Sequence, residues 1–113
     1  MSKRRQKELL LDIKEAIMRI NTYLNDLDIN DFYDDLKTQD AITRNIEIIG
    51  EASKMINKET KNNDKSIEWS YMAKTRDKLI HHYFGVNLDI IWGICKEDLP
   101  SLLKKIDSLI EKL

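Results

Sequence analysis

The stretch Thr75-Arg76-Asp77-Lys78-Leu79-Ile80-His81-His82-Tyr83-Phe84-Gly85 gives the most information about how this chain folds. It forms the second half of an expected helix that begins at Ser66 as N-cap and ends by Gly85. The apolar residues of this helix recur at spacings of three and four: Trp69, Met72, Ala73, Leu79, Ile80, Tyr83 and Phe84. Arg76 falls in the middle of this apolar face. Because a guanidinium group keeps its charge, we predict that Arg76 has polar partners that offset its desolvation.

Length and composition indicate one helical domain spanning residues 1–113. The chain is 35% charged and holds only three glycines and one proline, as expected for an all-α protein. Its net charge of −1 provides no general basic field, so any binding to nucleic acid depends on a local patch. The single Cys95 excludes an internal disulfide and suits a reducing compartment. The apolar run at residues 9–11 is too short for a signal peptide or a membrane span. We therefore expect a soluble cytoplasmic protein that does not bind membranes.

Apolar periodicity predicts the other helices. The first covers about residues 7–26, and the second begins after Thr38 as N-cap and runs to about residue 56. Asn87 is expected to cap a short helix, and Pro100 fits the first turn of a last helix that reaches the C-terminus. The result is an up-and-down bundle of four long helices plus a short one.

Two polar segments are expected to be exposed loops, namely 25–35 and 58–65. The first contains three residues at positions one, three and five of a possible calcium loop, which are Asp26, Asp28 and Asn30. However, Asp31 replaces the required glycine and Lys37 replaces the bidentate glutamate. Zinc is not expected either, because His81 and His82 point about 100° apart on a helix and no second ligand cluster exists. We predict no metal site.

Several polar residues of the second helix lie at spacings of three and four or beside its inner face: Arg44, Asn45, Glu47 and Glu51. Two interpretations remain open. These residues form a surface ladder of ion pairs, which contributes little to stability. Alternatively, Asn45 and one carboxylate point inward and hold Arg76. Gly50 in the middle of this helix predicts a close approach of another backbone.

The chemistry of Arg76 and His81 fits cleavage of RNA without a metal. Histidine can take up or return a proton near neutral pH, and arginine can bind a phosphate and stabilise its transition-state charge. The two residues lie five positions apart, about 140° around a helix, so two crossing copies would bring them together more easily than one. A satisfied structural network of polar side chains is the competing interpretation.

Three segments together resemble a known family. Met72–Gly85 is similar to the signature of the HEPN superfamily, and its Arg-x4-His-x-Tyr spacing resembles that of the HepT toxin branch. Arg44–Ala52 is similar to the second-helix motif of that branch. Trp92–Leu103, with its Asp98-Leu99-Pro100, is similar to the C-terminal segment. The resemblance extends over nearly the whole chain.

The resemblance implies an all-α, homodimeric, metal-independent endoribonuclease toxin that needs no cofactor and has its active cleft at the dimer interface. Arg76 and His81 match the catalytic positions, and Asp77 stands where the family carries a polar residue. His82 competes for the histidine role, although the tyrosine spacing favours His81. Tyr83 matches the residue to which a cognate MNT-type nucleotidyltransferase antitoxin adds AMP.

Two functional classes follow. The first is a ribonuclease toxin with RNA as substrate and the nucleotidyltransferase antitoxin as partner. The second is a non-catalytic helical module that binds a nucleotidyltransferase or a nucleotide through the same face. A purely structural role in dimerisation is a more distant third.

Overall fold

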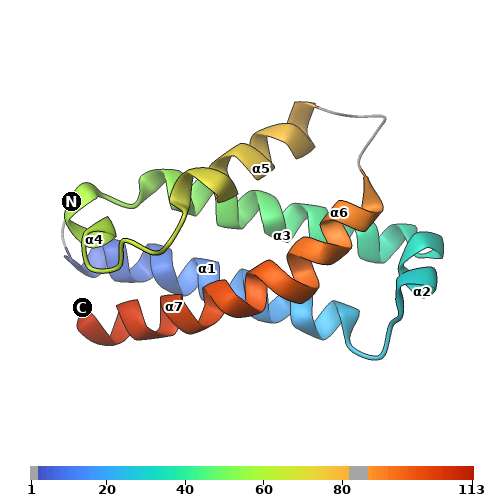
Figure 1. Cartoon of the computed structure of the whole chain (residues 1–113), viewed down its shortest axis with the longest axis horizontal. Coiled ribbons are helices and arrows are strands. Elements are labelled where there is room, and N and C mark those ends of the chain that lie inside the picture. The colour runs from blue at the N-terminus through green and yellow to red at the C-terminus, as the bar shows by residue number, and fades with distance from the viewer. Residues whose placement is uncertain (1–2, 82–86) are drawn as a thin grey trace.

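The computed structural model describes residues 3–81 and 87–113, and every regular element in these ranges is a helix (Figure 1). The four longest are α1 (Lys3–Leu24), α3 (Leu36–Met55), α5 (Trp69–His81) and α7 (Leu99–Lys112). α1 packs against both α3 and α7, and α5 packs on the other side of α3. Successive long helices run in opposite directions, so that α1 begins and α7 ends at the same end of the molecule (Figure 1). The all-α bundle of four long helices is thus confirmed.

The hydrophobic core lies between α1, α3 and α7. The inner faces of these helices supply side chains with no exposed surface: Leu10, Ile13, Ile17, Ile20, Ile42, Ile46, Ile49, Leu99 and Ile106. Their spacing of three, four or seven along each helix is the predicted apolar stripe. α1 begins at Lys3, four residues before the predicted start at residue 7, and ends at Leu24. The added first turn places buried Gln6 against the end of α3, where its Oε1 accepts a hydrogen bond from the Asn57 amide at 2.8 Å.

The prediction of an acidic loop over residues 25–35 is wrong, because this segment contains the short helix α2 (Ile29–Asp34). Asp28 and Asp31 form a capping box, each side chain accepting a hydrogen bond from the backbone of the other. Phe32 anchors the helix: it is fully buried, and its ring centroid lies 5.5 Å from that of Trp92. One aromatic side chain thus fixes a segment whose other residues are mostly exposed.

The N-cap of α3 is Asp35 rather than Thr38. Its carboxylate accepts hydrogen bonds from the Thr38 amide at 3.0 Å and from the Thr38 hydroxyl at 2.6 Å. The hydrogen bond from the hydroxyl, followed by the one from the amide, lowers the pKa of Asp35 below its usual 3.8; the hydroxyl makes the larger contribution. The predicted capping residue is therefore the hydrogen-bond donor, and the helix begins at Leu36.

The second predicted loop, 58–65, contains the one-turn helix α4 (Lys58–Lys61), capped by Asn57 and anchored by buried Thr60. α5 begins at Trp69 and not directly after Ser66, because Ser66 donates both its amide and its hydroxyl to Asp64 and so belongs to a turn. The predicted helix end at Gly85 lies outside the described residues.

Asn87 caps α6 (Leu88–Gly93) as predicted, accepting hydrogen bonds from the amides of Asp89 and Ile90. No break separates the short helix from the last one, because α6 continues through a π-helical turn, η1 (Ile94–Asp98), directly into α7. Pro100 lies in the first turn of α7, as predicted. Cys95 in this turn is buried, and burial raises the pKa of its thiol to about 12. Among the described helices, none combines the length and the hydropathy needed to span a membrane.

Candidate functional site

The candidate site lies at a close contact between α3 and α5. A Cβ atom added to Gly50 would lie 2.2 Å from the Cβ of Arg76 and 2.9 Å from the carbonyl oxygen of Met72. Such distances are far below van der Waals contact, so α3 can approach α5 this closely only with a glycine at position 50. The close approach predicted from the sequence is confirmed, and the residue it meets is Arg76.

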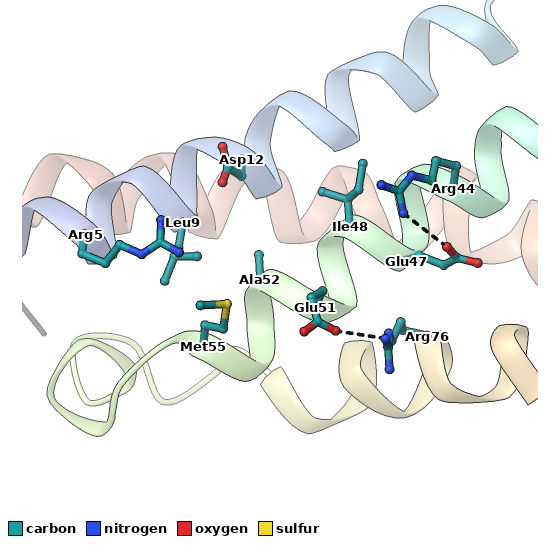
Figure 2. Close-up of a pocket in the computed structure, with 10 residues that line it drawn as sticks. All are labelled: Arg5, Leu9, Asp12, Arg44, Glu47, Ile48, Glu51, Ala52, Met55 and Arg76. Atoms are coloured by element: carbon teal, nitrogen blue, oxygen red, sulfur yellow. Dashed lines mark ion pairs between the residues drawn. The ribbon is translucent and has the colours of Figure 1, made fainter.

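Arg76 is held between two carboxylates. Its Nη2 lies 3.1 Å from Oε2 of Glu51 on α3, and its Nη1 lies 3.0 Å from Oδ1 of Asp77 on α5. The side chain is 26% exposed, so the stem is packed while the guanidinium reaches the surface. Figure 2 shows Glu51 and Arg76 pointing toward each other from the two helices. Arg76 therefore has the polar partners that its place on an apolar face requires.

A second cation, Lys54, completes this group. Its Nζ lies 2.9 Å from Oδ1 of Asp77, the same oxygen that Arg76 contacts. Two hydrogen bonds lower the pKa of Asp77 below its usual 3.8: the one from Lys54 has the larger effect, and the one from Arg76 has the next largest. We call Glu51, Lys54, Arg76 and Asp77 the ion-pair quartet. Sequence reasoning missed Lys54, although it follows Glu51 by three residues and so shares its side of α3.

Asn45 does not hold Arg76. Its side chain is 5% exposed, and its Nδ2 donates to the carbonyl of Ala41 in the same helix at 2.9 Å. Its Oδ1 is buried with no hydrogen-bond partner among the described residues. The surface-ladder interpretation holds for Arg44 and Glu47, which form an ion pair at 3.6 Å in which Arg44 is exposed and Glu47 is half-buried. The inward-pointing interpretation thus holds for Glu51, which contacts Arg76, and the surface-ladder interpretation holds for Arg44 and Glu47.

Beside the quartet lies a cavity of about 280 Å³ between α1, α3 and α5 (Figure 2). Arg76 and Glu51 form one side, while Arg5 and Asp12 of α1 lie on the other (Figure 2). Apolar side chains line part of the cavity, including Leu9, Ile48, Ala52 and Met55. The charged lining is balanced, because three arginines (Arg5, Arg44 and Arg76) are matched by three carboxylates (Asp12, Glu47 and Glu51). Guanidinium groups can bind phosphate oxygens through paired N–H donors when they are released from such carboxylates.

The remaining predicted residues follow Arg76 in the chain. His81 is the last residue of α5. His82 and Tyr83 lie outside the described residues. Among the residues that the structure does describe, no group of three or more His, Cys, Asp or Glu is arranged to hold a metal ion.

Comparisons with known proteins give a consistent result. The family model described as "Ribonuclease HepT-like" matches residues 13–109. The chain is 48% identical to "Probable ribonuclease HepT" of Thermococcus cleftensis, over 95% of this chain and 97% of that protein. It is 40% identical to "Putative RNase MJ0127" of Methanocaldococcus jannaschii, over 100% of this chain and 93% of the relative. No solved structure matches the chain.

Proposed function

Because the chain belongs to the HepT-like ribonuclease family, we propose that it is a metal-independent endoribonuclease that acts as the toxin of a toxin–antitoxin pair. The observation that carries this proposal is the position of Arg76. It is anchored at a close helix crossing, its guanidinium is partly exposed beside a cavity, and it precedes His81 by five residues.

The proposed reaction uses the ribose 2′-hydroxyl as nucleophile. His81 takes the proton from this hydroxyl, and the 2′-oxygen attacks the adjacent phosphorus. The bond from phosphorus to the 5′-oxygen breaks, and a protonated histidine returns a proton to that oxygen. Arg76 binds the phosphate and stabilises the charge that builds up on it. The products carry a 2′,3′-cyclic phosphate and a 5′-hydroxyl.

We place the active cleft at a homodimer interface. Arg76 and His81 lie about 140° apart around one helix, so a single straight helix does not aim both side chains at one phosphate. A twofold axis beside α5 would bring the arginine of one subunit near the histidine of the other.

We further propose that a nucleotidyltransferase antitoxin of the MNT type restrains the toxin by transferring AMP from ATP to the hydroxyl oxygen of Tyr83, with release of pyrophosphate. Tyr83 follows Arg76 by seven residues, nearly two helical turns, and so shares its side if the helical register continues. The phosphate of AMP would carry negative charge to the place where the RNA backbone binds and would repel it. After incubation with the antitoxin and ATP, the mass of the parent is expected to increase by one or more AMP units, whereas the mass of Tyr83→Phe is expected to stay unchanged.

The test of the catalytic proposal uses the chain expressed alone and the purified protein in EDTA. The parent is expected to arrest growth and to cleave RNA, leaving 2′,3′-cyclic phosphate ends, whereas His81→Ala does neither while remaining folded. Cleavage that survives His81→Ala would contradict the role of His81. Intact RNA and normal growth with the parent would overturn the nuclease proposal and favour a module that binds a nucleotidyltransferase.

A further inference from the structure

The quartet contains a cation that the proposed reaction does not use directly. We propose that Lys54 is a positioning residue of the ribonuclease site: it neutralises Asp77, so that Asp77 can orient Arg76 without repelling the RNA phosphate. This inference rests on the proposed function and adds to it a residue outside the Arg-x4-His-x-Tyr pattern.

The geometry places one oxygen between two cations. Oδ1 of Asp77 lies 2.9 Å from Nζ of Lys54 and 3.0 Å from Nη1 of Arg76. Nη2 of Arg76 lies 3.1 Å from Glu51. Asp77 therefore fixes one edge of the guanidinium, while the other edge contacts a carboxylate from a different helix. Because Glu51 is 56% exposed, it is the partner that a phosphate can replace most easily.

The charges of the quartet explain the need for Lys54. Glu51 and Asp77 together carry two negative charges, and Arg76 carries one positive charge. Without Lys54 the group would be net negative at the place where an anionic phosphate has to bind. With Lys54 it is neutral, and once the phosphate displaces Glu51 the three remaining side chains carry a net positive charge.

Stability alone does not account for this arrangement. The side chains of Lys54 and Asp77 are 38% and 45% exposed, and ion pairs this exposed contribute little to folding. Lys54 also stands in the last turn of α3, where a cation interacts favourably with the helix dipole. That effect depends only on the charge of Lys54 and is unrelated to Asp77, so the two roles can be separated by changing Asp77.

The experiment is a double-mutant cycle on RNA binding in the His81→Ala background, where RNA is not cleaved. Lys54→Ala is expected to weaken binding about tenfold, and Lys54→Arg to retain it within about twofold. In the presence of Asp77→Asn, the additional change Lys54→Ala is expected to have little effect. Lys37→Ala is the matched control, because it removes the same charge from the other end of α3, about 25 Å away.

Two results would overturn the inference. Equal binding by Lys54→Ala and its parent would show that Lys54 has no role. An equally large loss with and without Asp77→Asn would show that Lys54 acts on RNA independently of Asp77.

The same substitutions in the active protein separate this inference from the proposed function. If the protein without any of these substitutions cleaves no RNA, the proposed function fails and this inference fails with it. If that protein cleaves RNA and Lys54→Ala cleaves it with the same kcat/KM, this inference alone fails.

Discussion

The two sides of α3 make contacts of opposite character. Toward α1 the helix presents isoleucines with no exposed surface, namely Ile42, Ile46 and Ile49. Toward α5 it presents Gly50, with Glu51 and Lys54 beside it, and meets charged residues. The α1 side of α3 thus supplies stability through apolar burial, whereas its α5 side carries the charged groups that we propose take part in RNA binding.

The largest expected effect is the loss of a core side chain on the α1 side. Ile46→Ala is expected to lower the free energy of unfolding by about 2–5 kcal/mol, because it leaves a cavity in a fully buried site. Chemical denaturation measures this change. The control on the same helix is Leu36→Ala, which is 73% exposed and is expected to change stability by less than about 0.5 kcal/mol. Equal effects of the two substitutions would contradict the assignment of the core.

The next effect concerns the helix crossing. Gly50→Ala is expected to destabilise the protein by about 1–3 kcal/mol, because the new methyl group collides with Arg76 and the backbone of Met72. Gly93→Ala serves as its control: no described heavy atom outside its neighbours lies within 4 Å of the added Cβ, and a helical alanine is expected to stabilise by about 0.5–1 kcal/mol. If Gly50→Ala stabilised the protein as much as Gly93→Ala does, α3 and α5 would not approach as closely as described.

Glu51→Gln tests whether charged contacts on the α5 side affect binding more than folding. The substitution is expected to change stability by less than about 1 kcal/mol, because the Glu51 side chain is 56% exposed, and to increase RNA affinity severalfold in the His81→Ala background. The phosphate then no longer competes with a charged carboxylate for Arg76. Glu47→Gln, whose partner is Arg44, is expected to leave affinity nearly unchanged. A decrease in affinity with Glu51→Gln would show that Glu51 supports binding instead of competing with it.

The smallest effect is on pH dependence. The pKa of Asp77 is lowered in the folded protein, so its contribution to stability is present above the unfolded value of 3.8 and is lost as the pH falls through the folded value. An NMR titration should place the Asp77 midpoint below 3.8. Lys54→Ala should move it upward, because Lys54 is the main cause of the shift. A midpoint that Lys54→Ala leaves unchanged would rule out the contact between the two side chains.

The helical class and the long helices could be predicted because apolar periodicity depends on residues within one helix. The short helix α2 could not, since the burial of Phe32 depends on Trp92, sixty residues later in the chain. Caps were misplaced for a related reason: Thr38 and Ser66 are common capping residues, but here they donate to Asp35 and Asp64, which are equally good acceptors.

The candidate site, like the fold, could be predicted from the sequence only in part. The unusual position of Arg76 and the glycine at position 50 both pointed to a close, polar contact between two helices, and this contact is confirmed. Lys54 was missed because it contacts Asp77, 23 residues away on another helix. Asn45 has the residue type of a partner for Arg76, yet its amide is bonded to Ala41 of its own helix.

The most direct test of the catalytic role of Arg76 compares Arg76→Ala with Arg44→Ala, both in thermal unfolding and in RNA cleavage in EDTA. Both arginines border the same cavity, but only Arg76 lies at the α3–α5 crossing. Both variants are expected to fold and to unfold cooperatively, but Arg44→Ala should cleave RNA at close to the parent rate and Arg76→Ala should cleave none. RNA cleavage by folded Arg76→Ala at the parent rate would contradict a catalytic role for Arg76.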